Sequence, residues 1–182
     1  MGILGYRLFL IRSDTQTQFR KITNIDQLKK LRLGSGSQWS ISLALKRLGY
    51  RIHDGTKYEP LFQMLSEQRF DYFPRGINEI FGEFETRKDE ITNMKIEETL
   101  ALYLPLPTYF FVTPTRPDLA TRIKQGLLSI LEDGTMDQIF LEYHSDVIQK
   151  ARLKDRIIFK LPNLNLSDET PFHRKDFWYH PE

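Results

Sequence analysis

Strand-like and helix-like segments alternate along the first half of the chain, and this alternation constrains the fold more than any other feature. The run YRLFLIR at residues 6–12 is apolar and β-rich, which predicts a buried strand. Residues 22–31 then carry apolar side chains at helical spacing, and a strand-like run follows at 32–37. Because such alternation is typical of βαβ units, we expect an α/β fold with a mostly parallel sheet flanked by helices.

The rest of the chain continues the pattern. We expect helices at 37–49, 57–69, 77–91, 118–134 and 135–153, and strands at 50–55, 70–76, 94–104, 109–113 and 155–163. Residues typical of helix ends stand at the expected boundaries: Asn24 or Thr23, Ser37 and Thr135 as N-caps, Gly49 after a C-terminus and Pro60 in a first turn. The polar tail from Leu164 onward is expected to wrap a surface.

Composition excludes several kinds of site. Without cysteine the chain has no disulfide, thiolate metal ligand or cysteine nucleophile. The four histidines are scattered and none stands at metal-ligand spacing from another, so we expect neither a metal nor a cofactor. Lys and Arg are spread along a chain of net charge +2, which argues against a nucleic-acid-binding surface. The apolar start lacks the features of a signal peptide, so export is expected to need sequence outside this chain.

The loop LGSGSQWS, residues 33–40, is the strongest candidate site. It lacks the Lys of a phosphate-binding P-loop, and the bulk of Trp39 opposes the close packing of a dinucleotide-binding loop. What remains is a helix N-terminus with free N–H groups and small hydroxyls, which suits a carboxylate. An ordinary capped turn between a strand and a helix stays an open alternative.

Arg75 stands at the C-terminal end of a predicted strand, where ligands bind in open α/β sheets. Its guanidinium could take a carboxylate or phosphate in bidentate fashion, and a salt bridge to a local carboxylate such as Glu79 is the alternative. The neighbouring acids Glu97 and Glu98, and likewise Glu83 and Glu85, are expected to be solvated. No catalytic residue is expected, because the Gly-x-Ser-x-Gly elbow is absent and no second group is coupled to His53 or Asp54.

The order of these pieces resembles the type 2 periplasmic solute-binding proteins, especially the amino-acid-binding family of ABC transporters. The likeness rests on LGYRLFLIR with KITNIDQLKKLRLGSGS, on GTKYEPLFQMLSEQRFDYF, and on YFFVTPTRPDLATRIKQGLLSILEDGTMDQIFLEY, and it covers residues 3–145. It implies a two-lobed clamp whose Gly-Ser/Thr loop binds the α-carboxylate of the ligand. The ligand-binding set that follows is Ser35, Gly36, Ser37, Gln38, Trp39, Thr56 and Arg75.

Two departures from the family shape the expectation. Where amino-acid binders carry an acid for the ammonium of the ligand, this chain has Gly76 beside Arg75, which favours a second anionic group on the ligand. The chain also begins at the hinge strand. The predicted division is residues 1–11 as hinge strand, 12–102 as a nearly complete lobe, and 103–182 as a crossover, a returning partial lobe and a tail.

The function implied by the resemblance is non-catalytic binding of a small polar or anionic solute. Delivery to a membrane permease and a periplasmic location follow from the same resemblance. The alternatives are a ligand-sensing domain of a signalling or transcriptional regulator, and a truncated domain without binding activity. We also expect the incomplete lobe to expose apolar surface, which favours self-association.

Overall fold

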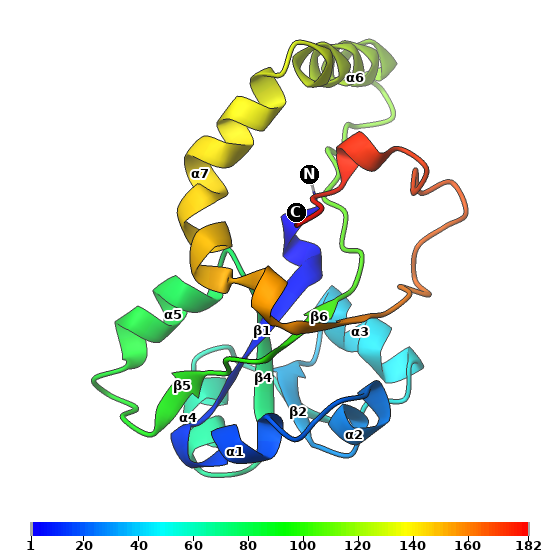
Figure 1. Cartoon of the computed structure of the whole chain (residues 1–182). Helices are drawn as coiled ribbons and strands as arrows, with labels where there is room; N and C mark the ends of the chain where they lie inside the picture. Colours follow the sequence, from blue (N-terminus) through cyan, green and yellow to red (C-terminus); the bar gives the residue numbers. More distant parts are fainter. Residues whose placement is uncertain (1, 182) are drawn as a thin grey trace.

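One seven-stranded sheet runs through the structure, a computed structural model that describes residues 2–181 (Figure 1). The strands lie in the order β3-β2-β4-β1-β6-β7, and β5 also pairs with β1. The strands are β1 (Tyr6–Arg12), β2 (Leu33–Gly36), β3 (Ile52–Gly55), β4 (Tyr72–Gly76), β5 (Met94–Ile96), β6 (Leu100–Tyr103) and β7 (Ile157–Lys160). The helices are α1 (Gln16–Phe19), α2 (Ile25–Lys29), α3 (Ser40–Arg47), α4 (Pro60–Ser66), α5 (Ile80–Arg87), α6 (Pro117–Glu132) and α7 (Thr135–Ala151), and the 3-10 turn η1 (Ile3–Gly5) precedes β1.

Strand β1 runs against the direction of the other strands. It pairs antiparallel with β4, β5 and β6, whereas β2 is parallel to β3 and β4, and β6 is parallel to β7. All strands of the sheet except β1 therefore point the same way, which confirms the predicted α/β fold with a mostly parallel sheet. The predicted division into 1–11, 12–102 and 103–182 stays a prediction, and the sheet crosses both boundaries.

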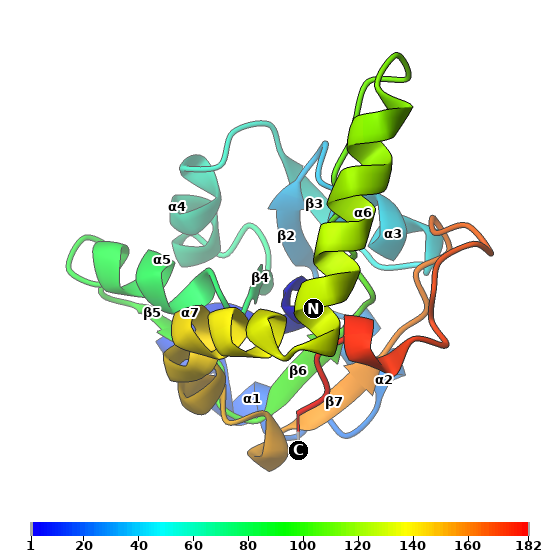
Figure 2. The ribbon, with the colours of Figure 1, turned by 90° about the horizontal axis from the view of Figure 1, so that it is seen from above.

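The side chains of β1 alternate between the two faces of the sheet, as the period of two along a strand requires. Leu8 and Leu10 pack in a core cluster with residues of α4 and α5. Phe9 and Ile11 pack in a second cluster with residues of α2 and α3. Burying such a side chain fully contributes about 1.5–3 kcal/mol. Strand β1 thus joins the two helical layers, which lie on opposite sides of the sheet in Figure 2.

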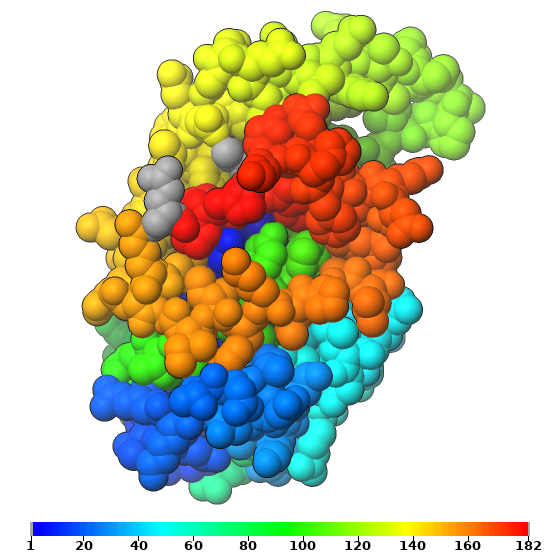
Figure 3. Space-filling model, turned by 45° about the vertical axis from the view of Figure 1, so that its right-hand side comes forward, coloured from blue at the N-terminus to red at the C-terminus, as the bar shows by residue number. Residues whose placement is uncertain are grey.

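Helices α6 and α7 stand away from the sheet and bury little of their surface (Figure 1). No residue of α6 is buried, and α7 buries only Phe140 and Ala151. The tail after β7 crosses the molecule between these helices and the lobe below, drawn orange to red in Figure 3. It returns to the start of the chain, where the Gly2 N–H donates to the Phe177 carbonyl oxygen over 3.2 Å. The predicted surface tail is confirmed.

Two predicted N-caps are wrong, whereas the predictions for Asn24, Gly49 and Pro60, which opens α4, are confirmed. Trp39, not Ser37, precedes α3, because residues 37–38 form a turn before the helix begins. Gly134, with φ of 80°, precedes α7 in place of Thr135. Asn24 does cap α2, since its Oδ1 accepts the Gln27 N–H, and Gly49 adopts φ of +79° after α3, a conformation that glycine reaches without steric cost.

The predicted strand at 109–113 is wrong, because this segment has no regular secondary structure and pairs with no strand in the described chain. The predicted strand at 94–104 is two strands, β5 and β6, with a turn between them. Glu97 makes this turn: its carboxylate accepts the N–H groups of Thr99, at 2.8 Å, and Leu100, at 2.6 Å. Glu97 is fully buried, so its expected exposure is also wrong, whereas Glu98 is exposed as predicted.

Candidate ligand-binding site

The glycines of the loop are required by close packing at the end of β2. A Cβ on Gly34 would lie 2.2 Å from the Phe70 ring, and a Cβ on Gly36 would lie 2.4 Å from the Trp39 indole. Only glycine allows the backbone to approach these rings so closely. Trp39 therefore packs against the loop, and its indole lies on the backbone of Gly36.

Most polar groups of the loop already have partners within the protein. The Ser42 hydroxyl lies 2.6 Å from the Ser35 hydroxyl and 2.6 Å from the Gly36 carbonyl oxygen, in a fully buried arrangement. The Ser37 N–H donates to the Gly55 carbonyl oxygen over 2.9 Å, and the Trp39 N–H donates to the Gly36 carbonyl oxygen over 3.1 Å. The arrangement fixes the loop and ties it to the end of β3.

Gln38 is where the loop meets solvent. Its side chain is exposed and that of Ser37 is partly exposed. Within residues 2–181, the Gln38 N–H donates to no backbone carbonyl oxygen and to no side chain. The outer surface of the loop therefore offers one backbone donor and the Ser37 hydroxyl, close to the start of α3, where the helix dipole favours negative charge.

Arg75 is buried at the end of β4. Two carboxylates hold it: that of Glu79, the residue before α5, and that of Glu83 in α5. Its Nε donates to Glu83 Oε2 over 2.7 Å and its Nη2 donates to Glu83 Oε1, while Glu79 lies 3.4 Å away. Burial lowers the pKa of Arg75, but the Glu83 hydrogen bonds and the charge of Glu79 outweigh it, so the pKa lies above its usual value. Both local acids pair with Arg75, and the predicted exposure of Glu83 is wrong.

Aromatic rings enclose the Arg75 guanidinium. Its central carbon lies 4.7 Å from the Trp39 ring centre, 5.2 Å from that of Phe73 and 5.4 Å from that of Tyr58. Trp39 and Phe73 are stacked with their centres 6.0 Å apart. Contacts of a guanidinium with ring faces are worth about 0.5–2 kcal/mol each. Trp39 thus connects the loop after β2 to Arg75 at the end of β4.

Glu79 links Arg75 to Arg7 on β1, so that positive and negative side chains alternate from Glu83 to Arg7. Glu79 Oε2 accepts hydrogen bonds from Arg7 Nη1, at 3.1 Å, and from the Gly76 N–H, at 2.9 Å. Burial lowers the pKa of Arg7 to about 10, although the neighbouring Glu79 charge opposes the change. At the other end, the Tyr58 hydroxyl donates to Glu83 Oε1 over 2.6 Å. The charges of the two arginines and the two glutamates balance, so the cluster is neutral overall.

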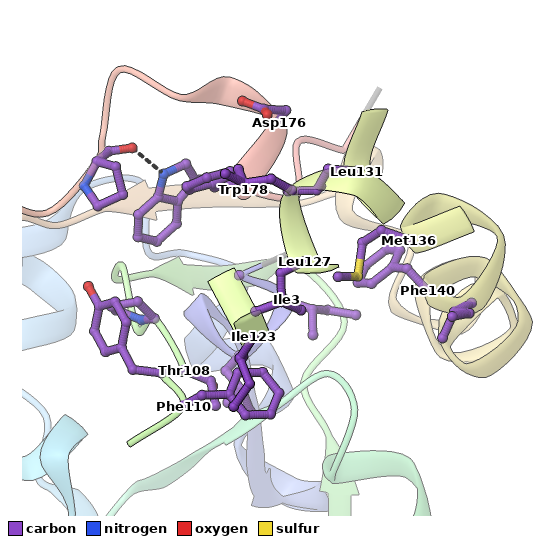
Figure 4. A pocket seen from close by; sticks show the side chains of 18 of the residues that line it. Ile3, Thr108, Phe110, Ile123, Leu127, Leu131, Met136, Phe140, Asp176 and Trp178 are labelled. Atoms are coloured by element: carbon purple, nitrogen blue, oxygen red, sulfur yellow. Dashed lines mark hydrogen bonds between the residues drawn. The ribbon is translucent and has the colours of Figure 1, made fainter. Parts of the chain in front are cut away.

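The structure brings the seven sequence-predicted site residues to one edge of the sheet, at the carboxyl ends of β2, β3 and β4. Ser35, Gly36, Ser37, Gln38 and Trp39 form the loop, and Arg75 contacts it through the indole. Thr56 follows β3, beside the loop, and lines a small pocket of about 240 Å³. A larger cavity of about 1030 Å³ lies between η1, the coil at 106–112, α6, α7 and the tail (Figure 4). From the loop after β4, Asn78 also lines this cavity.

Solved structures identify the fold. An ancestral arginine-binding protein bound to arginine aligns with a TM-score of 0.53 and 16% identity, over 76% of this chain and 59% of its own. An arginine 3rd transport system periplasmic binding protein from Legionella pneumophila aligns with a TM-score of 0.53 and 15% identity, over 78% and 62%. The chain has the fold of a type 2 periplasmic binding protein. It spans about three-fifths of the length of these two proteins.

No protein-family model and no curated protein matches the sequence. The binding-protein fold nonetheless gives the candidate site a physical location. In open α/β sheets, ligands bind beyond the carboxyl ends of the strands, and the loop, Trp39 and Arg75 lie there. Within the described residues, no helix is long and apolar enough to cross a bilayer.

Sequence reasoning missed the residues that surround Arg75. Tyr58 and Phe73 had no assigned role, and Arg7 was seen only as part of a strand. Arg7 did carry a signal, because it is a charged residue in a strand that is otherwise buried. A charge at such a position needs a partner. The partner is Glu79, the residue before α5.

Proposed function

We propose that this chain binds a small polar or anionic solute without catalysis, as the solute-binding component of an ABC-type transporter. The observation that carries the proposal is the polar edge formed by the loop at 35–39 and Arg75, at the carboxyl ends of parallel strands in a binding-protein fold. The two aligned proteins are named for arginine, and one is called a periplasmic binding protein. Periplasmic location and delivery to a membrane permease belong to the same proposal.

The carboxylate of the ligand is assigned to the exposed side of the loop. The Gln38 N–H and the Ser37 hydroxyl face it, whereas Ser35 and Gly36 hold the loop in shape from inside. Trp39 supplies an apolar wall, and Thr56 lies beside the loop because Gly55 accepts the Ser37 N–H. These roles follow from which groups have partners inside the protein and which do not.

Arg75 is assigned to an anionic group of the ligand. The hydrogen bonds to Glu83 occupy two of its nitrogens and fix the guanidinium in place. Its Nε and Nη2 donate to Glu83, and among the described residues Nη1 donates to none. A ligand anion can use Nη1 without breaking the pair with Glu83. Because Glu79 and Glu83 lie on the same surface, a ligand that also carries a positive group is accommodated there.

The test uses isothermal titration calorimetry with amino acids, dicarboxylates, phosphorylated small molecules and neutral sugars. Gln38→Pro removes the backbone donor, and Gln38→Ala, the matched control, keeps it. Losing a hydrogen bond to a charged group weakens binding by about 1.5–3 kcal/mol, or roughly 10- to 150-fold. We expect that loss in Gln38→Pro alone. Equal affinities for both variants, with circular dichroism showing both folded, would exclude the loop as the carboxylate site, and binding only to neutral sugars would exclude an anionic ligand.

A further inference from the structure

Three hydrogen-bond donors converge on one carboxylate oxygen beside the end of β4. Glu79 Oε2 accepts the Gly76 N–H over 2.9 Å and Arg7 Nη1 over 3.1 Å. Arg75 Nη2 lies 3.4 Å from the same oxygen. Two guanidinium groups and a backbone N–H around one oxygen are the groups with which proteins bind anions. In the structure, the anion that they surround is a side chain of the protein itself.

The two arginines are more deeply buried than the carboxylate that they share. The side chains of Arg7 and Arg75 are each 8% exposed, whereas that of Glu79 is 32% exposed. Gly76 leaves room for the carboxylate, because a Cβ there would lie only 3.0 Å from Glu79 Oε2. The donors therefore belong to strands β1 and β4 of the sheet, and the acceptor is the partly exposed group, which is able to turn out into solvent.

Arg7 keeps unused hydrogen-bonding capacity. A guanidinium has five N–H donors, and within residues 2–181 the Arg7 side chain donates to Glu79 and to no other residue. Its Nε is buried without a partner in this part of the chain, and an unmet donor on a buried charge is costly. Burial also holds the pKa of Arg7 at about 10, although Glu79 opposes this. Glu79 thus satisfies the buried charge of Arg7 only in part.

We propose that Arg7, Arg75 and the Gly76 N–H form an anion subsite that Glu79 fills from within. The ligand class is a dicarboxylate: one carboxylate binds the loop at 35–39, and the second takes the place of Glu79 when that side chain turns outward. A carboxylate suits the subsite because the group already held there is a carboxylate. The inference rests on the proposed function, and it adds Arg7 as a binding residue and Glu79 as an internal competitor.

The internal competitor makes the subsite selective. Glu79 is tethered beside the arginines, so its effective concentration exceeds that of a free carboxylate in ordinary solution. A monocarboxylate without further contacts does not displace it. A ligand whose other carboxylate is bound at the loop has the same advantage of tethering as Glu79 and is able to compete. We therefore expect dicarboxylates to bind the chain more tightly than matched monocarboxylates.

Added formate tests the subsite in Glu79→Ala without involving the loop. The thermal midpoint of this variant should fall below that of the wild type, because Arg7 loses its carboxylate. Formate at several times its dissociation constant should raise the midpoint by about 2–4 °C relative to chloride at equal ionic strength. The wild type should show no such difference between the salts. Neither should Glu85→Ala, the matched control, which removes an exposed glutamate of α5.

The double variant Glu79→Ala/Arg7→Met separates binding at the subsite from general effects of formate, because it also removes the buried cation. The formate-specific shift should disappear in it. If Glu79→Ala does not fold, Glu79→Gln, which keeps the shape of the side chain and loses its charge, is measured in the same way. The absence of a formate-specific shift in the folded variant overturns the subsite, and so does an equal shift in the double variant.

Calorimetry with malonate, succinate and glutarate tests the exchange with Glu79. The dicarboxylate that binds best should bind Glu79→Ala at least about tenfold more tightly than the wild type, because the internal competitor is gone. Affinity that is equal, weaker or absent in the variant overturns the exchange.

The two proposals fail in different ways. A formate effect in Glu79→Ala, combined with equal ligand affinities of Gln38→Pro and Gln38→Ala, would keep the subsite and exclude the loop. The opposite pair of results would keep the loop and exclude the subsite.

Discussion

Trp39 and Arg75 are in direct contact, with the guanidinium carbon 4.7 Å from the centre of the indole ring. The indole lies on Gly36, and the guanidinium donates through Nε and Nη2 to Glu83. The loop after β2 and the end of β4 are thus coupled through one cation–π contact. A change to either residue should alter both the stability of the lobe and the shape of the candidate site.

Replacing Arg75 with Ala should lower the free energy of unfolding by about 3–5 kcal/mol, because it leaves the mostly buried Glu83 carboxylate without the positive charge that it pairs with. Urea denaturation followed by circular dichroism measures the change. Arg116→Ala is the control, since the Arg116–Asp118 pair is exposed and should contribute less than about 1 kcal/mol. Equal losses for the two variants would show that the Arg75 pair is not stabilising.

Glu97 should be among the most sensitive acidic positions in the chain. Its buried carboxylate accepts bonds from Gln16 Nε2, at 2.7 Å, and from the Thr99 and Leu100 N–H groups, and Arg156 lies 3.7 Å away. Glu97→Ala leaves these buried donors unsatisfied, which should cost about 3–5 kcal/mol. In Glu98→Ala, on the exposed side of the same turn, thermal unfolding should shift far less. A small shift in Glu97→Ala would contradict the proposed role of the carboxylate in the turn.

Two glycine-to-alanine changes should have opposite effects on stability. Gly34→Ala places a Cβ against the Phe70 ring and should destabilise by about 1–3 kcal/mol through overpacking. Gly126→Ala lies in α6 with no atom near the new Cβ and should stabilise by roughly 0.5–1 kcal/mol through helix propensity. Differential scanning calorimetry of both variants gives the sign of each effect. A stabilised Gly34→Ala protein would mean that the ring can move aside.

Stability should fall as the pH rises above about 10, the ordinary pKa of tyrosine. Burial raises the pKa of Tyr50, Tyr58 and Tyr72 in the folded protein, and Glu83 adds to the effect at Tyr58. The folded chain therefore binds more protons than the unfolded chain in this range, and the free energy of unfolding decreases with pH. The lowered pKa of Arg7, about 10, acts in the opposite sense, but the raised tyrosines outnumber it.

Ultraviolet absorbance of tyrosinate measures this directly. In the native protein part of the tyrosine signal should appear only at a pH well above that of the chain unfolded in urea. If all eight tyrosines titrated together in the native state, as they do after unfolding, the predicted loss of stability would be excluded.

The sequence is sufficient to predict the order of elements in the lobe, because each strand and helix there has a local pattern. Residues 8–11 are apolar throughout, and Pro60 and Gly49 stand at helix ends where backbone geometry favours them. The position of Arg75 at a strand end follows from the same patterns. These features depend on neighbouring residues only, so they can be inferred without knowing the fold.

The features that were missed depend on partners distant in the sequence. Residues 109–113 have strand propensity but no partner strand in the described chain, so tertiary context overrides propensity. Glu97 resembles a surface acid until Gln16 and Arg156 are brought to it from both ends of the chain. Likewise, the Glu83 side chain is turned inward because Arg75 and Tyr58 lie beneath α5.

The reversed strand β1 has a consequence for the order in which the protein folds. It precedes all of its partners in the chain, because β4, β5 and β6 lie between residues 72 and 103. The central strand must therefore remain unpaired until at least β4 has been synthesised, some 60 residues later, and its apolar side chains stay exposed during that time. Because such long-range pairings slow folding and expose surfaces that aggregate, we expect the efficiency of folding in the cell to depend on how β1 is shielded during synthesis.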